Sequence, residues 1–515
     1  MRRREAIHPL LLPGLPVAAY PRAPRVPRLP LPHLTVFILA LGALAVGGAP
    51  PVPWPRGAAP TPAEIEVMLD EAQQIEAREQ LDEWLSAMED GEASGHLPVV
   101  QADIDDGLYS LADLFRLGDS FFSHPFTVHP DGFGDGHFVA LRRVHDGVRG
   151  GLDTFSCAGC HSVGGPDGAG SSTEDALVGG DGDRHSSANQ RNAPALQGGG
   201  LVQALGAEMS LVLGFQRDEA RAEAAKLGKP VQIDLSTHGV SFGWILAHPD
   251  GLVDTSHVVG VDPDLVVKPF GWKGNVARLR RFVEDAARIH FGIQSHVLAL
   301  GWKDSPDVAH LGAGPNWWDP DGDEHAHELH EGMLTAAAVY LAMLETPAVI
   351  PPAHEELRDR WASGSALVAK IGCEECHRRE LNLANTFWRE KADTTDGEVL
   401  LSLLQDGEQP RGSNVVNLWS DLKRHAMGPG LADPHDDETG LPRDVFLTRP
   451  LWGLAETAPY LHDGRAATIP EAILAHGGEA KKARDAFAAL SPAERADVHV
   501  FLLSLTREPR VRVIR

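Results

Sequence analysis

Two five-residue segments combine cysteine and histidine in the same order. Residues 157–161 read Cys-Ala-Gly-Cys-His, and residues 373–377 read Cys-Glu-Glu-Cys-His. Two thiols three positions apart reach the two vinyl groups of one haem, and the histidine that follows lies under the iron as its proximal ligand. The pattern therefore predicts two covalently attached c-type haems. The residues expected to bind them are Cys157, Cys160 and His161 in the first segment, and Cys373, Cys376 and His377 in the second.

Cysteine pairs also form zinc sites and redox disulfides. The chain has four cysteines, all within these two segments, so a disulfide framework spread over the fold is excluded. A zinc site built from both pairs gives no reason for a histidine after each pair. A thioredoxin-like disulfide needs a βαβ context, which the surrounding sequence lacks. Haem attachment accounts for both cysteines and the histidine of each segment.

The first sixty residues are typical of an export segment. Arginines precede an apolar run from Leu34 to Val46, and small residues follow that run. Together these parts describe a secretory signal. The alternative is a membrane anchor, but the run is shorter than the roughly twenty residues that span a bilayer. We expect a signal peptide over residues 1–49, a periplasmic or otherwise exported protein, and no stable membrane span after cleavage.

The charge balance bears on the partners of the chain. Its 72 acidic and 46 basic residues give a formal net charge of −26 at pH 7. An acidic field repels phosphate backbones, so nucleic acid is not expected as a partner. The same field suits a basic partner, such as a small redox protein that donates electrons, although acidity that merely keeps the chain soluble explains it equally well.

The chain is too long for one hydrophobic core. Following the signal peptide, we predict a proline-rich linker over residues 50–62 and an N-terminal helical extension over residues 63–137. An N-terminal haem c domain with inserted segments is expected over residues 138–350, and a C-terminal cytochrome c-like haem domain over residues 354–515. The fold class expected is mainly α, with two cytochrome c-like haem domains, long loops and few strands.

Local patterns predict several individual elements. Apolar spacing indicates helices over Ala63–Met88, Asn275–Ile289 and Ala326–Leu344. Capping boxes begin two more helices, one at Thr468 with Glu471 and one at Ser491 with Glu494. The best strand candidates are Leu211–Phe215 and Val231–Leu235.

Three stretches resemble the bacterial di-haem oxidoreductase family, which is related to the di-haem cytochrome c peroxidases. They are Phe138–Gly170 around the first motif, Phe270–Ser295 with its FGWK sequence, and Arg449–Ala480 with YLHDGRA and HGGEA. The resemblance covers most of residues 138–505. It implies two cytochrome c-like domains between whose haems electrons pass. It also implies that one haem has an exchangeable or open position where hydrogen peroxide is cleaved, while the other is six-coordinate and relays electrons from a donor.

The resemblance also suggests how the C-terminal haem is held. In the peroxidase relatives the distal ligand lies one short helix after a His-Asp-Gly sequence. Here residues 462–464 read His-Asp-Gly, and the capped helix that follows ends at His476, where the peroxidases have methionine. Met427, in a loop rich in glycine and proline, is the competing ligand. Arg465 is the candidate partner of a haem propionate, because guanidinium suits a carboxylate.

The N-terminal half lacks a corresponding His-Asp-Gly sequence, which leaves its sixth ligand open. Gln203 and Glu208 are the candidate catalytic residues of an open distal pocket, in which a carboxylate shuttles the protons of peroxide. The alternative for both is a solvated loop. His185, 24 residues after His161, is a rival sixth ligand that would close the site.

A tryptophan and an acidic segment also bear on the expected function. Trp272, in the FGWK sequence, either lies between the haems and assists electron transfer or is ordinary buried packing. The acidic segment Asp319–Glu324 resembles a calcium loop in composition, but the spacing and terminal glutamate of an EF-hand are missing, which argues against calcium.

Taken together, these features predict an exported di-haem c oxidoreductase, an enzyme resembling the cytochrome c peroxidases. Peroxidase-type chemistry is expected at the N-terminal haem, with electron relay through the C-terminal one. Two alternatives stay open. One is a di-haem electron-transfer cytochrome without a substrate site, and the other is a di-haem oxidase of a protein or organic substrate.

Overall fold

The computed structural model describes residues 99–124, 144–145, 148–149, 154, 156–171, 175–179, 185–291, 295, 297, 329–403, 414–437 and 439–507. All of them belong to the second of two compact units, Val67–Arg515, and the first unit is Met1–Glu66. The expected signal peptide, the linker and the predicted helix Ala63–Met88 lie outside the described residues. Within the described part, no helix is long and apolar enough to cross a membrane.

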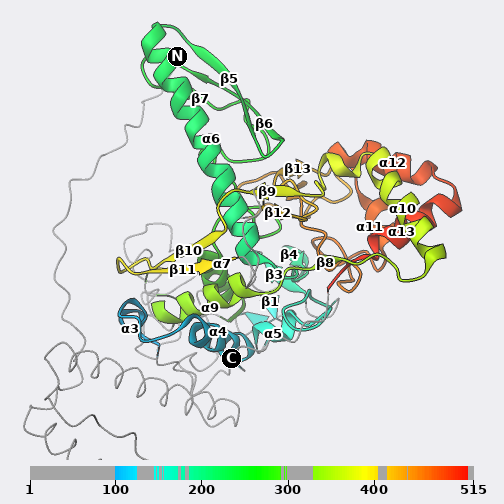
Figure 1. Ribbon diagram of the computed structural model, residues 1–515, viewed down its shortest axis with the longest axis horizontal. Helices are drawn as coiled ribbons and strands as arrows, with labels where there is room; N and C mark the ends of the chain where they lie inside the picture. The colour runs from blue at the N-terminus through cyan, green and yellow to red at the C-terminus, as the bar shows by residue number, and fades with distance from the viewer. Residues whose placement is uncertain are drawn as a thin grey trace, which may run out of the picture. The chain divides into compact units, whose positions relative to one another are not determined.

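Helices form most of the regular structure (Figure 1). The α-helices of the described part are α3 (Gln101–Asp105), α4 (Leu111–Ser123), α5 (Cys157–Cys160), α6 (Gly199–Leu227), α7 (Leu279–Ala286), α9 (Glu331–Met343), α10 (Glu355–Lys370), α11 (Ile469–Ala475), α12 (Lys481–Ala489) and α13 (Pro492–Leu502). Short turns of other helix types are η1 (His185–Ser187), η2 (Ala287–Phe291), η4 (Cys373–Glu375) and η5 (Gly478–Ala480).

Small antiparallel sheets connect these helices. Their strands are β1 (Val144–His145), β2 (Val148–Arg149), β3 (Ala176–Val178), β4 (Asn189–Arg191), β5 (Val231–Thr237), β6 (Val240–Ala247), β7 (Val253–Asp254), β8 (Ala348–Val349), β9 (Leu381–Leu383), β10 (Phe387–Lys391), β11 (Glu398–Ser402), β12 (Asn414–Val416), β13 (Arg424–Ala426), β14 (Val445–Leu447) and β15 (Leu505–Thr506). The pairs are β1–β2, β3–β4, β9–β12, β10–β11, β13–β14 and β8–β15, and β5–β6–β7 is a three-stranded sheet. The sequence predicted few strands. The described part contains more strands than this, because strands of two or three residues are too short to show an alternating pattern in the sequence.

Helix α6 contains Leu211–Phe215, one of the two expected strands, so this prediction is wrong. Buried residues such as Leu205, Met209 and Leu213 recur every four positions along α6, which places them on one face of a helix. Strands β5 and β6 lie along α6 (Figure 1), and this packing outweighs the local β preference of the segment. The other expected strand, Val231–Leu235, is confirmed as part of β5, which pairs with β6.

The predicted helix starts in the C-terminal half are confirmed. Thr468 caps α11 and Ser491 caps α13, each by accepting a hydrogen bond from the main-chain N–H three residues on. The other two predicted helices are shorter than expected. The first is α7, which continues into the π turn η2, and the second is α9, which begins at Glu331.

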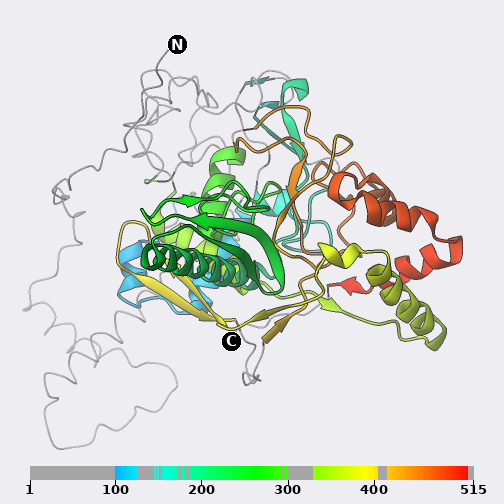
Figure 2. The ribbon, with the colours of Figure 1, turned by 90° about the horizontal axis from the view of Figure 1, so that it is seen from above.

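Buried apolar residues form two clusters. The larger cluster combines α4, α6, α7 and α9 with β5 and β6, and it also includes Leu381, Trp388 and Leu418 from the chain after α10. The smaller cluster lies among α10, α11, α12 and α13, which are grouped together in both views (Figures 1 and 2). The expected domain boundary at 350–354 falls between α9 and α10, yet the strands that follow α10 pack into the first core. Residues of both halves therefore meet around the cysteine–histidine motifs.

Candidate functional site

The second motif lies at the end of α10. Gly372 ends this helix with φ at +91°, a left-handed conformation that glycine adopts without strain, and the chain then enters the turn η4. The His377 Nδ1 atom lies 3.1 Å from the carbonyl oxygen of Trp419. Because a carbonyl only accepts, Nδ1 carries the proton and Nε2 keeps its lone pair. Burial lowers the pKa of His377 to about 4, so the ring is neutral at pH 7, as an iron ligand must be.

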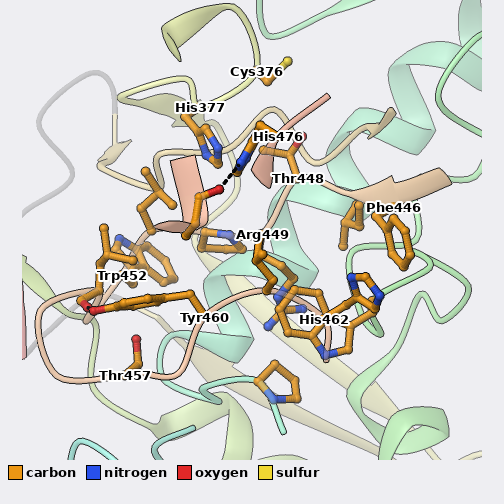
Figure 3. Close-up of a pocket in the computed structure, with 18 of the residues that line it drawn as sticks. Cys376, His377, Phe446, Thr448, Arg449, Trp452, Thr457, Tyr460, His462 and His476 are labelled. Carbon is orange, nitrogen blue, oxygen red and sulfur yellow. Dashed lines mark hydrogen bonds between the residues drawn. The ribbon is translucent and has the colours of Figure 1, made fainter. Parts of the chain in front are cut away.

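Both candidates for the sixth ligand lie at the same cavity as His377. His476 ends α11, and its Nδ1 atom lies 2.7 Å from the carbonyl oxygen of Ala472, which again leaves Nε2 available. Burial lowers the pKa of His476, and its charge in turn lowers that of His377. Figure 3 shows the two imidazoles in the same part of the pocket. Met427 also lines the cavity, with its main chain against Gly477 and Gly478. The choice of His476 stays a prediction.

The cavity has a volume of about 370 Å³ and is lined mainly by apolar side chains. Around the second motif these include Val368, Ile371, Leu451, Leu454, Ile473 and Leu502. The cavity continues to Ala169 and to residues 192–197 of the N-terminal half. Two thiols, a neutral imidazole with a free nitrogen and apolar walls are what a haem attached through thioethers needs, so the residues present fit this group.

The histidine of the first motif is held in the same way as that of the second, although the local helix differs. Ser156 caps α5 by accepting a hydrogen bond from the Gly159 N–H, at 3.1 Å. The His161 Nδ1 atom lies 3.1 Å from the carbonyl oxygen of Gly168, and burial lowers the pKa of His161 to about 4. Cys157, Cys160 and His161 do not line the cavity, but Pro194, which does, lies close enough to His161 to affect its pKa.

Burial also bears on the chemistry of the thiols. It raises the pKa of Cys157 to about 12 and that of Cys373 to about 11. Zinc ligation and disulfide exchange both require thiolate, which these surroundings disfavour. Cys376, Asp421 and His425 do lie close enough together to hold a metal ion, but a thioether at Cys376 would remove one member of that group.

Comparison with known proteins identifies a family of haem proteins. Residues 204–505 match the sequence profile of a family described as "Di-haem oxidoreductase, putative peroxidase". This range is more than half of the chain, and it contains the second motif and Arg449–Ala480. The chain belongs to the di-haem oxidoreductase family. The first motif lies before the matched range. The family assignment makes the protein a haem-dependent oxidoreductase.

Two solved structures resemble this di-haem oxidoreductase. Hydrazine synthase of Kuenenia stuttgartiensis, pressurised with xenon, is 16% identical with a TM-score of 0.30, and the match covers 75% of this chain and 94% of that one. A MauG-like protein associated with microbial copper homeostasis is 17% identical with a TM-score of 0.27, and the match covers 50% of this chain and 77% of that one. No curated protein matches the sequence.

Arg449 is a candidate functional residue that the sequence argument missed. It lines the cavity of the oxidoreductase, where Figure 3 shows it together with His377 and His476. Burial lowers its pKa to about 10, and its charge lowers the pKa of His161, which places it near both motifs. Its guanidinium donates to the carbonyl oxygen of Ala195, at 3.5 Å, and lies over the ring of Trp272, whose centroid is 5.7 Å from the guanidinium carbon. Among the described residues no carboxylate pairs with it.

A half-buried guanidinium without a carboxylate partner among the described residues is destabilising, so Arg449 calls for an anionic partner. A haem propionate would supply one. Arg465, the expected propionate partner, lies elsewhere. Its guanidinium pairs with Asp463, donates to the carbonyl oxygen of Gly430 at 2.7 Å, and is not part of the cavity lining. A sequence motif does not reveal which of two nearby arginines already has a carboxylate neighbour. A propionate-binding role for Arg465 stays a prediction, which this placement does not support.

The two candidate catalytic residues join elements of the fold. The Gln203 side-chain oxygen accepts a hydrogen bond from the Leu279 N–H, at 2.7 Å, at the start of α7. The Glu208 carboxylate accepts hydrogen bonds from the N–H groups of Ala384 and Asn385, and it lies 3.0 Å from the His238 ring. Neither residue lines the cavity. A catalytic role for them stays a prediction, which this placement does not support.

The FGWK and His-Asp-Gly sequences meet beside the cavity. The Trp272 indole N–H donates to the carbonyl oxygen of Asn192 at 2.7 Å, and its ring meets His462 edge-on at 6.4 Å. The His462 ring stacks on Phe446 at 4.2 Å. Asp433 joins both halves here, since it binds Arg191 through two hydrogen bonds, both of 2.7 Å, and pairs with Lys273 and His462. Trp272 therefore packs at the contact between the halves.

Another histidine lies near the first motif. His290, in the π turn η2, is close enough to His161 for its charge to lower the pKa of that ring. It stands in the Phe270–Ser295 block, where its position gave no sign of this proximity. The side chain of His185, the earlier rival for the sixth position, lies outside the described residues, as does the acidic segment Asp319–Glu324.

Proposed function

We propose that this protein is an exported oxidoreductase with one c-type haem on each motif, peroxidase-type chemistry at the N-terminal haem and electron relay through the C-terminal one. The observation that carries the proposal is that His377 and His476 line the same cavity. Each ring has Nδ1 tied to a main-chain carbonyl, so each offers Nε2 at the same cavity. These two imidazoles would hold the iron of the C-terminal haem, which would then supply electron-transfer chemistry, and the exchangeable position would fall to the other haem.

The protein's own side chains bind and orient the group. When bound, haem supplies the redox chemistry. Arg449 would bind a propionate, because its guanidinium lies in the cavity without a carboxylate partner among the described residues. The carbonyls of Gly168 and Trp419 keep each proximal imidazole in one tautomer and one orientation. Apolar residues such as Ile371 and Leu451 exclude water from the C-terminal haem.

The placement of Gln203 and Glu208 favours a second candidate function, a di-haem electron carrier without a substrate site. Both groups are held in hydrogen bonds that join elements, so neither is aimed at a peroxide pocket. In that case His290 would take the sixth position of the N-terminal haem, as a second bis-histidine site.

Electron paramagnetic resonance of the oxidised holoprotein separates these two functions. The peroxidase proposal expects one high-spin and one low-spin iron, with cyanide or peroxide shifting the spectrum of one haem per chain. Two low-spin irons that ignore cyanide in every redox state would instead support the electron carrier. In that event His290→Ala should open one iron to cyanide, whereas the control His248→Ala, in the loop after β6, should not.

Two further parts of the proposal concern the cell. We propose a small basic redox protein as the electron donor, because the net charge of −26 attracts such a partner. Export is supported by the basic and apolar leader and by the oxidising compartment in which thioether attachment takes place. Recovery of a processed chain in the periplasmic fraction tests it, and an unprocessed haem-free chain in the cytoplasm would contradict it.

A further inference from the structure

Tyr340, in α9, is a buried phenol beside the first motif. Its side chain is 4% exposed, and its hydroxyl donates to the Asp167 carboxylate at 2.5 Å. Asp167 is itself 5% exposed, and its main-chain oxygen accepts hydrogen bonds from the Leu196 N–H and the Gln197 side chain. The carboxylate therefore belongs to the loop that holds the first haem site.

Aromatic rings connect Tyr340 to the proximal imidazole. The Phe122 ring centroid lies 5.8 Å from that of His161 and 5.5 Å from that of Tyr340. Asp167 directly precedes Gly168, whose carbonyl oxygen binds the His161 Nδ1 atom. The phenol is thus coupled to His161 both through ring contacts and through a short stretch of main chain.

A second carboxylate also interacts with the phenol. Asp119, on the exposed face of α4, also interacts with the Tyr340 hydroxyl. Helices α4 and α9 touch here, because a Cβ atom added at Gly118 would lie 2.4 Å from the carbonyl oxygen of Ala336 and 2.5 Å from the Tyr340 Cβ. The phenol therefore interacts with a buried acid and with one that reaches solvent.

We propose that Tyr340 is a redox-active tyrosine that supplies one electron to the N-terminal haem after peroxide has oxidised that haem. This inference rests on the proposed function. The phenolic O–H bond breaks, the electron goes to the oxidised haem, and the proton goes to the Asp167 carboxylate, which leaves a neutral phenoxyl radical. An electron from the reducing partner then returns the radical to phenolate, and the proton on Asp167 restores the phenol.

The surroundings favour this coupled transfer over an ordinary packing role. Packing requires only that the buried hydroxyl have one partner, which a main-chain carbonyl would provide. Here the partner is a base with a raised affinity for the proton, because burial raises the pKa of Asp167 to about 6. Burial also raises the pKa of Tyr340, so the proton stays on oxygen until the electron leaves.

Rapid-freeze electron paramagnetic resonance after one equivalent of hydrogen peroxide tests the proposal on the full-length holoprotein. We expect an organic radical signal that narrows when the protein contains ring-deuterated tyrosine. Tyr340→Phe should abolish this radical signal. Tyr109→Phe, at a partly buried tyrosine that packs against the same core, should leave the signal unchanged. Asp167→Asn keeps an oxygen that accepts the hydrogen bond but is a far weaker base, so the radical yield should fall several-fold.

The outcomes also separate this inference from the proposed function. If peroxide changes the haem absorption of the wild type but no tyrosyl signal forms, or the signal survives in Tyr340→Phe, the inference is wrong and the peroxidase proposal stands. If peroxide leaves the haem absorption unchanged, both fail. Should Tyr340→Phe not retain haem, an undiminished radical in Asp167→Asn overturns the proton-acceptor role, and a reduced one supports it.

Discussion

At the scale of single residues, the main-chain carbonyls beside the motifs decide how the imidazoles act. His161, His377 and His476 each have Nδ1 next to a carbonyl oxygen, at 2.7 to 3.1 Å. One tautomer is therefore selected three times, and Nε2 is the nitrogen left available as a ligand in every case. The two candidate arginines differ from each other in their partners. Arg465 pairs with Asp463, whereas Arg449 has no carboxylate partner among the described residues and is available to an anionic cofactor.

Replacing the two candidate distal ligands distinguishes them. We expect His476→Ala to convert the C-terminal haem to a high-spin or differently ligated form, because His476 offers Nε2 at the cavity. Met427→Ala should leave its ligation unchanged. Absorption and electron paramagnetic resonance spectra of the oxidised variants measure this. An unchanged spectrum for His476→Ala with an altered one for Met427→Ala would move the ligand to Met427.

Arg449→Gln should lower the reduction potential of the haem it contacts, because loss of a nearby positive charge favours ferric over ferrous iron. A unit charge about 8 Å away at an effective dielectric of about 20 contributes roughly 2 kcal/mol, which corresponds to several tens of millivolts. Spectroelectrochemical titration provides the measurement. Arg465→Gln is the matched control and should shift the potential far less, so equal shifts would contradict the assignment.

At the scale of elements, a buried ionic network connects α7, α9 and β10. Arg280, 2% exposed, donates to the side chains of Thr335 and Glu331 at 2.8 Å each and to Asp393 at 3.1 Å. It also contacts Glu390, which is 1% exposed, at 3.4 Å. These contacts position the helices that line the N-terminal part of the cavity.

Removing the central cation of this network should destabilise the fold strongly. We expect Arg280→Ala to lower the free energy of unfolding by about 3–5 kcal/mol, because buried carboxylates lose their partner. Arg389→Ala is a suitable control, because Arg389 lies in β10 next to Glu390. Its exposed pair with Glu398 should be worth about 1 kcal/mol or less. Denaturant unfolding of the haem-loaded variants compares the two, and similar losses would refute the ranking.

The acid in this network predicts a pH dependence. Burial raises the pKa of Glu390 from 4.5 to about 7. A raised carboxyl pKa contributes stability that is fully present below about pH 4.5 and is lost as the pH rises through about 7. Glu390→Gln stays neutral, so its stability relative to wild type should rise by about 3 kcal/mol between pH 4 and pH 8. Parallel stability curves for the two proteins would contradict this.

At the scale of the whole molecule, the two halves are joined around the cavity. Arg191 and Lys273 from the N-terminal half bind Asp433 from the C-terminal half. Arg449, which follows β14 in the C-terminal half, lowers the pKa of His161 in the N-terminal half through its charge. The cavity is correspondingly lined by both halves.

Two attached haems should be countable. Holoprotein is expected to keep both after extraction with acidified acetone, because thioether bonds do not dissociate, and its intact mass should exceed that of the processed chain by two haems. Replacing Cys157 and Cys160 together by serine should leave one, and so should replacing Cys373 and Cys376. Retention of both haems in either double variant would falsify the attachment.

The sequence by itself determined the chemistry that depends on short spacing. Two thiols and a histidine within five residues indicate haem attachment, and a threonine or serine three residues before glutamate indicates a helix start. Both patterns act between neighbours along the chain, so no tertiary contact is needed to recognise them. The family resemblance rests on similar short blocks.

Only the packed fold shows which of several suitable side chains line the cavity and which are engaged in other contacts. It places Arg449 rather than Arg465 in the cavity, engages Glu208 with the main chain after β9, and packs Leu211–Phe215 into α6. It also sets the Tyr340 phenol against Asp167, 173 residues away in sequence. Burial and pairing depend on groups that are distant along the chain, and these groups become neighbours only when the helices pack.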